Sequence, residues 1–195
     1  MKAPDLPPIV AFLSELDRLK LVYRRSYARD LSRRENSAEH SWHLAMAVLT
    51  FAREMDLPID VPRTVEMALA HDVCEIDAGD VSVYQRDAQE RAVTELACVN
   101  RLAGFSPLFA QRMRELWLEY EAQETPESRW LKVFDRIMPF IVNIASDGRA
   151  WRDDGIRKSQ VLGVHEFIRD IAPGIHAWIV AEVELCVRRG WLVDA

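Results

Sequence analysis

The chain has 195 residues, enough to bury a hydrophobic core in a single domain that spans residues 1–195. Its 31 acidic and 25 basic residues give a formal net charge of −6, which argues against sequence-independent binding to nucleic acid or to anionic lipid. The three cysteines are odd in number, widely spaced and without a CxxC pair, so the sequence indicates neither a disulfide framework nor a thiolate zinc site and predicts reduced thiols.

The sequence carries no apolar run of the roughly 18 residues that a membrane-spanning helix needs. Its start, MKAPDLPPIV, also lacks the long apolar region of a signal peptide. Together with the reduced thiols, these features predict a soluble protein of the cytoplasm that does not enter a membrane.

Hydrophobic residues recur at helical spacing along nearly the whole chain, and no segment alternates as a strand does. We therefore predict an all-α domain. The first helix follows Pro7 and Pro8 and carries apolar residues three and four apart from Ile9 to Leu21. A loose basic segment, YRRSYARDLSRREN, comes next.

The second predicted helix begins near Ser37, whose hydroxyl could cap it, and ends before the turn at Pro58. Pro62 opens a third helix, which we expect to continue to Gly79 because glycine tolerates the left-handed conformation at a helix end. Further helices are predicted over residues 85–103, 106–121, 127–147, 159–170 and 174–190.

The stretch ALAHDVCEIDAGD, residues 68–80, places ionisable side chains among apolar ones, where they need partners. Adjacent helical residues diverge by about 100°, so His71 and Asp72 are expected to be poor partners for one another but able to flank a third object. A divalent metal ion between them would be reached by an imidazole nitrogen and a carboxylate oxygen, provided that other helices add ligands. Glu75 lies one turn further along the same face.

An isolated His-Asp pair on a helix is usually a surface feature, but other residues accompany this one. His40 lies in ENSAEHSWH, 31 residues before His71, and Asp135 lies in WLKVFDRI. The ordered set His, His-Asp, Asp is the signature of the HD-domain metal-dependent phosphohydrolases, which this sequence resembles.

The resemblance is strongest to bacterial 5'-deoxynucleotidases and their eukaryotic HD-domain relatives. Four segments carry it, within residues 14–145: RLKLVYR, ENSAEHSWHLAMAV, ALAHDVCEIDAGDV and LWLEYEAQETPESRWLKVFDRI. It implies an all-helical HD domain, commonly a homodimer, that removes phosphate from nucleoside 5'-monophosphates.

The resemblance also implies roles for seven residues. The metal ligands would be His40, His71, Asp72 and Asp135. The catalytic residues would be Glu75 and Asp80, and Arg25 would contact the phosphate. Two imidazoles and two carboxylates leave about two positions of an octahedron for water, which suits one manganese, cobalt, iron or magnesium ion. A water on that metal could attack phosphorus, and the sequence leaves open which of the two catalytic carboxylates is base and which is acid.

The chain departs from the deoxynucleotidase pattern in two places. Ser26 stands where those relatives have a tryptophan, so their preference for deoxyribose over ribose does not carry over. After Asp80 the chain lacks a loop with proline and lysine, and Arg86 is the nearby cation.

Other candidate side chains favour ordinary structural roles. His43, one turn after His40, is expected to pack or to hydrogen-bond rather than to add a fifth ligand. We expect His165 and His176 to be ordinary histidines and Cys74 to be a small core residue.

Three function classes stay open. The sequence favours a 5'-nucleotidase over an HD hydrolase of an alarmone or a cyclic nucleotide, and over a metal-bound nucleotide sensor without activity. Alarmone hydrolases follow the His-Asp pair with a Glu-Asp pair, whereas the residue at position 76 here is Ile76, and the glycine-containing signature of the cyclic-di-nucleotide branch is missing. A late apolar stripe is expected to cover the core or a partner subunit; it comprises Ile175, Trp178, Ile179, Val183 and Val187.

Overall fold

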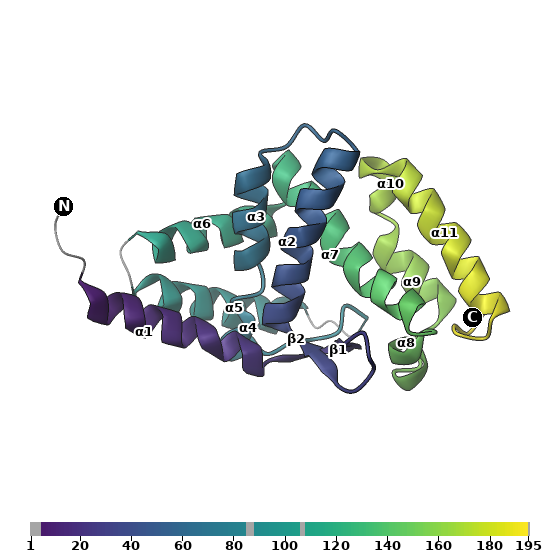
Figure 1. Cartoon of the computed structure of the whole chain (residues 1–195), viewed down its shortest axis with the longest axis horizontal. Coiled ribbons are helices and arrows are strands. Elements are labelled where there is room, and N and C mark those ends of the chain that lie inside the picture. The colour runs from purple at the N-terminus through teal and green to yellow at the C-terminus, as the bar shows by residue number, and fades with distance from the viewer. Residues whose placement is uncertain (1–4, 85–87, 106–107, 195) are drawn as a thin grey trace. The chain divides into compact units, whose positions relative to one another are not determined.

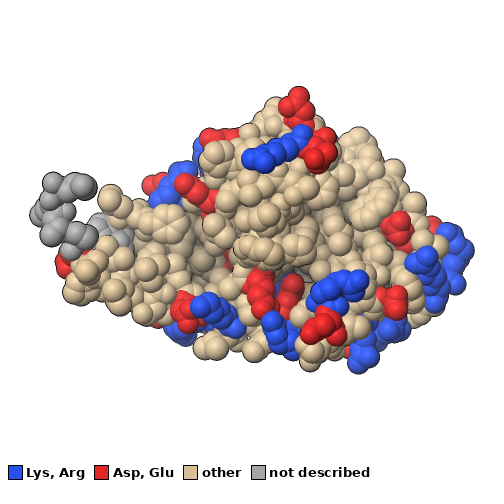
Figure 2. Space-filling view, in the orientation of Figure 1, with Lys and Arg blue, Asp and Glu red and all other residues tan. Residues whose placement is uncertain are grey.

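The computed structural model describes residues 5–84, 88–105 and 108–194 (Figure 1). These residues are mostly helical, which confirms the predicted all-α class. The chain divides into two compact units, one with residues 1–23, 36–80 and 87–131 and the other with residues 24–35, 81–86 and 132–195. Among the described residues, no helix is both long and apolar enough to span a bilayer. Acidic and basic side chains are interspersed on the face drawn in Figure 2.

The first unit is built from helices. They are α1 (Leu6–Leu16), the 3-10 helix η1 (Asp17–Leu21), α2 (Ser37–Glu54), α3 (Val61–Ala70), α4 (Glu75–Ala78), α5 (Ala88–Ala103) and α6 (Phe109–Ala122). Helix α3 packs against both α2 and α6, and α5 packs against α4 and α6. The buried side chains of these helices include Leu44, Val48, Met67, Leu102 and Leu116.

The second unit joins a two-stranded hairpin to the C-terminal helices. Its elements are β1 (Tyr23–Tyr27), β2 (Arg34–Asn36), α8 (Arg149–Asp153), α9 (Lys158–His165), α10 (Ile168–Ile171) and α11 (Pro173–Arg188). Helix α7 (Pro126–Ala145) begins in the first unit and continues in the second. The rings of Trp151, His165 and Trp178 pack on Phe140, with centroids 5.3 to 5.6 Å apart.

The hairpin replaces the loose segment expected between the first two helices. Its paired inner positions are polar: Ser26 and Glu35 are both buried, and the Ser26 hydroxyl donates to the Glu35 carboxylate at 2.5 Å. Arg24 adds an ion pair to Glu35 at 3.7 Å. Because the buried side chains of the hairpin are polar, its strands lack the alternation of apolar and polar residues from which a strand is predicted.

The start of α2 corrects a second expectation, because Asn36 rather than Ser37 caps this helix. The Asn36 side chain accepts a hydrogen bond from the Glu39 backbone at 3.0 Å, and the Glu39 carboxylate accepts one from the Asn36 backbone at 3.0 Å. This reciprocal capping box satisfies two backbone N–H groups at the helix start. Ser37 is the first helical residue, and its hydroxyl points elsewhere.

The third predicted helix is not continuous to Gly79. Helix α3 ends at Ala70, and α4 begins only at Glu75. Between them, backbone N–H groups bond to the third residue back, as from Val73 to Ala70 at 3.3 Å, instead of to the fourth. The end at Gly79 is confirmed, with a φ of 72° that suits glycine.

The remaining helices follow the prediction more closely. The predicted helix over 159–170 is divided into α9 and α10, and the short α8 was not predicted. In α11, Ile179 and Val183 are fully buried, so these two members of the late stripe cover the core of their own unit. Residues 85–87 and 106–107, where two predicted helices start, lie outside the described residues.

The capping box gives a stability prediction. Replacement Asn36→Ala should lower the free energy of unfolding by about 1 kcal/mol, because it leaves the Glu39 N–H without its side-chain acceptor. Replacement Asn36→Asp keeps that acceptor and should stay close to the parent. Equal urea midpoints for Asn36→Ala and the parent would show that the cap does not stabilise α2.

Candidate metal centre

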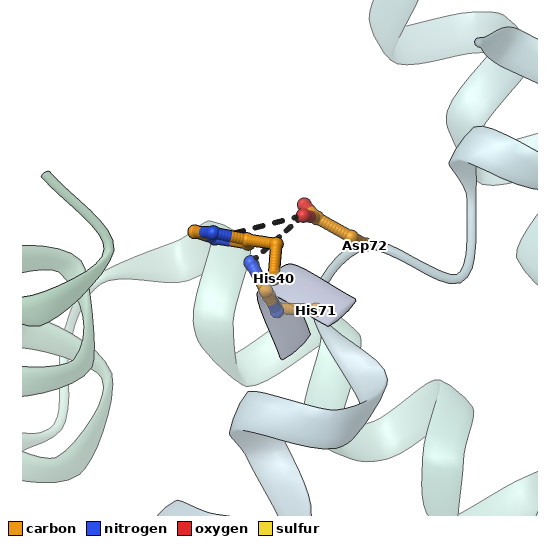
Figure 3. A group of neighbouring side chains, drawn as sticks. All are labelled: His40, His71 and Asp72. Atoms are coloured by element: carbon orange, nitrogen blue, oxygen red, sulfur yellow. Dashed lines mark ion pairs between the residues drawn. The ribbon is translucent and has the colours of Figure 1, made fainter. Parts of the chain in front are cut away.

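Three of the predicted ligands lie together in the first unit. His40 is in the first turns of α2, and His71 and Asp72 are in the turn that follows α3 (Figure 3). One ligand atom from each lies within 4.8 Å of the other two. The packing of α2 against α3 brings them together, since 31 residues separate His40 from His71 in the chain.

The closest approach within the cluster joins neighbours in sequence. The Asp72 Oδ2 atom is 3.1 Å from Nε2 of His71 and 4.0 Å from Nε2 of His40. The two residues can flank a third object, as expected, but the expectation that their side chains diverge was wrong. It assumed a regular helix, whereas the helix ends at Ala70 and the tighter turn brings the two side chains together.

The tautomer of His71 follows from its other ring nitrogen. Nδ1 lies 2.8 Å from the carbonyl oxygen of Ala68, and because a carbonyl only accepts, Nδ1 carries the hydrogen. In the neutral ring Nε2 then presents its lone pair to Asp72. The edge-on ring of Tyr120, with its centroid 5.3 Å away, also packs against the imidazole.

This donor set fits a divalent cation. A nitrogen lone pair and a carboxylate oxygen 3.1 Å apart repel each other unless a proton or a cation accompanies them. Both histidines are buried, so water screens that repulsion poorly. Asp72 Oδ2 lies 3.1 and 4.0 Å from the two histidine nitrogens, and both separations are within the roughly 4.2 Å that two atoms can span when each is bonded to one ion at about 2.1 Å.

Glu75 is the first residue of α4 and is only 3% exposed. Its Oε2 accepts a hydrogen bond from the Ser37 hydroxyl at 2.5 Å, and its Oε1 lies 3.6 Å from the Arg91 guanidinium. Its backbone N–H bonds to the Asp72 carbonyl at 3.0 Å. The predicted catalytic carboxylate is therefore attached through its backbone to the turn that carries two of the candidate ligands.

The other end of α4 is also held by charge. Asp77 accepts a hydrogen bond from Arg101 at 2.8 Å, and Arg18 lies 3.6 Å away. Burial alone would raise the pKa of Asp77, but the hydrogen bond and the charge from Arg101 hold it below its ordinary value. Asp80 follows two residues beyond α4, is half-buried, and belongs to the same unit; its catalytic role stays a prediction.

Two predicted site residues belong to the second unit. Asp135 lies on α7, is buried, and pairs with Arg136 at 2.7 Å. Arg25 lies on β1, where its carbonyl accepts a hydrogen bond from the Arg34 side chain and its own side chain is exposed. That Asp135 and Arg25 join the cluster stays a prediction. Arg86 lies outside the described residues.

His43, His165 and Cys74 have the packed or buried surroundings that their expected structural roles require. His43 stacks on Trp42, with ring centroids 6.1 Å apart. Burial lowers the pKa of His165, whose ring nitrogens lie 2.6 and 3.2 Å from the carbonyls of Val161 and Arg136. Cys74 is buried, which raises its pKa well above the ordinary value and makes a reactive thiolate unfavourable.

Sequence reasoning missed two residues of this site. Ser37 was expected to be a helix cap, and Arg91 was not singled out at all. Ser37 is three residues before His40, and that spacing on one helix face is the only signal that the chain offers for it. Arg91 belongs to no motif, so only the packing of α5 against α4 reveals its contact with Glu75.

The cluster predicts metal-dependent stabilisation. Addition of Mn²⁺ to metal-stripped protein should raise the melting temperature, since a ligand that binds only the folded state at 100 times its Kd stabilises by about 2.7 kcal/mol. The substitution His40→Ala should weaken Mn²⁺ binding by more than about 10-fold, because loss of a residue that only hydrogen-bonds to a metal ligand already costs about 10- to 100-fold in affinity. His43→Ala is the matched control on the same helix, and equal losses in the two variants would contradict the assignment.

Comparison with known proteins places the chain in a family. The HD-domain family profile matches residues 16–176. A 5'-deoxynucleotidase from Schizosaccharomyces pombe is 30% identical over 143 residues, which cover 70% of this chain and 71% of that protein. A 5'-deoxynucleotidase from Bos taurus is 29% identical over 132 residues, covering 66% of this chain and 62% of that protein. The match thus spans less than two thirds of the bovine relative.

Solved structures agree with the sequence comparison. A predicted metal-dependent phosphohydrolase from Magnetospirillum magnetotacticum has a TM-score of 0.88 and 35% identity, covering 97% of this chain and 96% of that one. An HD-domain phosphohydrolase from Listeria innocua has a TM-score of 0.66 at 17% identity over 94% of this chain and 95% of that one, and shows the shared fold alone. The chain therefore belongs to the HD-domain family, as a relative of HD-domain phosphohydrolases and of 5'-deoxynucleotidases.

Proposed function

We propose that this protein is a metal-dependent 5'-nucleotidase that removes phosphate from nucleoside 5'-monophosphates. The proposal rests on the cluster of His40, His71 and Asp72. Glu75 lies next to this cluster, because its backbone N–H bonds to the carbonyl of Asp72. The 30% identity to a 5'-deoxynucleotidase over 70% of the chain supports the substrate class.

The proposed metal site has four protein ligands. His40, His71 and Asp72 supply three, and Asp135 is proposed as the fourth because it matches the last aspartate of the HD signature. Two neutral imidazoles and two carboxylates balance the charge of one divalent ion, for which manganese, cobalt, iron and magnesium are all chemically suited. When bound there, such an ion would lower the pKa of a water ligand toward neutrality and would withdraw charge from phosphoryl oxygens.

The carboxylates near the cluster supply the proton transfers in this proposal. Glu75 accepts a proton from the attacking water as the new P–O bond forms. Asp80 gives a proton to the nucleoside 5'-oxygen as its bond to phosphorus breaks, so the products are a nucleoside and inorganic phosphate. If Asp80 were the base and Glu75 the acid, the same bonds would form and break and the same number of protons would be transferred.

Substrate recognition in the proposal rests on the hairpin of the second unit. The exposed Arg25 guanidinium can bind phosphate through two parallel charged hydrogen bonds. Ser26 is buried against Glu35 rather than offering a large ring, so we propose that both ribose and deoxyribose nucleotides are accepted. A homodimer and a cytoplasmic location belong to the same proposal, through the family resemblance and the three reduced cysteines.

A substrate panel tests the activity. Metal-stripped protein should release phosphate from deoxyribonucleoside and ribonucleoside 5'-monophosphates only after Mn²⁺, Co²⁺, Fe²⁺ or Mg²⁺ is added. Guanosine tetraphosphate and a cyclic dinucleotide belong in the same panel. Turnover of one of these compounds, with no release from any monophosphate, would replace the proposal with hydrolysis by another branch of the family. Metal-dependent nucleotide binding without any turnover would indicate a sensor.

Two acidic substitutions should fail in different ways. Asp72→Ala removes a ligand, so both metal content and phosphate release should fall. Glu75→Gln keeps the shape of the side chain and all four proposed ligands but removes the proton acceptor. It should retain metal and nucleotide affinity while kcat falls by about 10²- to 10⁴-fold. Metal analysis and single-turnover kinetics distinguish the two, and parental turnover in Glu75→Gln would remove Glu75 from the mechanism.

A further inference from the structure

Glu75 is a buried carboxylate, and burial of a charge is costly unless hydrogen bonds and an opposite charge accompany it. Two side chains from different helices provide these. Ser37 on α2 approaches Oε2 at 2.5 Å, and Arg91 on α5 approaches Oε1 at 3.6 Å. Each oxygen of the carboxylate is therefore contacted by a different residue.

Ser37 is held in position by contacts other than the one to Glu75. It is fully buried, and its backbone N–H donates to the carbonyl of Val22 at 2.9 Å. The hydroxyl oxygen lies 3.5 Å from that carbonyl but 2.5 Å from Glu75, so its single proton is donated to the carboxylate. Because Ser37 and His40 are three residues apart on α2, one turn of helix presents both a candidate ligand and this donor.

Arg91 is aimed by a second carboxylate. Its Nε atom pairs with Glu95, one turn further along α5, while its terminal nitrogen reaches toward Glu75. Burial lowers the pKa of Arg91, but the hydrogen bond and the charge of Glu95, together with the charge of Glu75, raise it overall, so the guanidinium stays charged. Arg91 therefore supplies a fixed positive charge on the side of Glu75 that Ser37 does not contact.

We propose that Ser37 and Arg91 are positioning residues that fix the plane and orientation of the Glu75 carboxylate for proton transfer. This inference rests on the proposed function. The hydrogen bond from Ser37 restrains one carboxylate oxygen, and the charge of Arg91 attracts the other, which limits rotation of the carboxylate. Reacting groups that are held in a productive geometry react faster than groups that rotate freely.

Serine variants test the hydroxyl. Ser37→Ala should lower kcat by about 10- to 100-fold, the range expected when a hydrogen bond to a charged group is lost. KM and metal content should stay near parental values. Ser37→Thr restores a hydroxyl and should recover most of kcat. Ser41→Ala is the matched control: Ser41 is buried one turn along the same helix, and its hydroxyl makes no hydrogen bond within the described residues.

Arginine variants test the charge in the same assays. Arg91→Met removes the cation and should lower kcat, whereas Arg91→Lys keeps a positive charge and should lose less. A merely structural role predicts instead that melting temperature and kcat fall together, and that Arg91→Lys gives no selective recovery of kcat.

A double-mutant cycle shows whether Ser37 acts through Glu75. In the Glu75→Gln background, Ser37→Ala should cause little further loss of kcat, because the group that it positions is already disabled. In metal-stripped protein, the effects of Ser37→Ala and Glu75→Ala on the melting temperature should also be non-additive, which gives a readout without activity.

The outcomes separate the two proposals. If the parent releases phosphate and both Ser37→Ala and Arg91→Met keep parental kcat, the positioning role is wrong and the proposed function stands. Additive effects in both cycles would also overturn the positioning role. If the parent releases no phosphate from any monophosphate with any of the metals, the proposed function is overturned, and with it the inference that rests on it.

Discussion

The packing of α2 against α3 is the contact on which the candidate metal centre depends. Buried side chains such as Leu44 and Met67 stabilise these helices in the first unit. Their association places His40 beside the turn that carries His71 and Asp72, and it brings Ser37 within hydrogen-bonding distance of Glu75. Hydrophobic burial thus offsets the cost of gathering polar and charged groups in a site that water reaches poorly.

The end of α3 at Ala70 gives this cluster its geometry. A continuous helix would direct His71 and Asp72 about 100° apart, as the sequence alone suggests. The tighter turn instead brings Asp72 to 3.1 Å from His71 and begins α4 at Glu75. No glycine or proline marks this break, so helical propensity and periodicity do not reveal it. The same limit applies to the hairpin, whose buried partners Ser26 and Glu35 are polar.

Most of the helical fold and the three clustered candidate ligands could be predicted from the sequence, because helical periodicity is local and the HD signature fixes residue types and their order. The contacts around Glu75 could not. Arg91 lies 16 residues beyond Glu75 and in no motif, and its role depends on how α5 packs against α4. Ser37 was noticed only as a cap, because Asn36 and Ser37 are both good capping residues and only the backbone geometry decides between them.

We propose that one divalent ion is bound by His40, His71, Asp72 and Asp135. Anomalous diffraction from crystals of the manganese-loaded protein, recorded on both sides of the manganese absorption edge, tests it most directly. We expect one strong manganese peak in contact with an imidazole nitrogen of each histidine and a carboxylate oxygen of each aspartate. A peak bound by other side chains, or one that the Asp135 carboxylate does not reach, would contradict it.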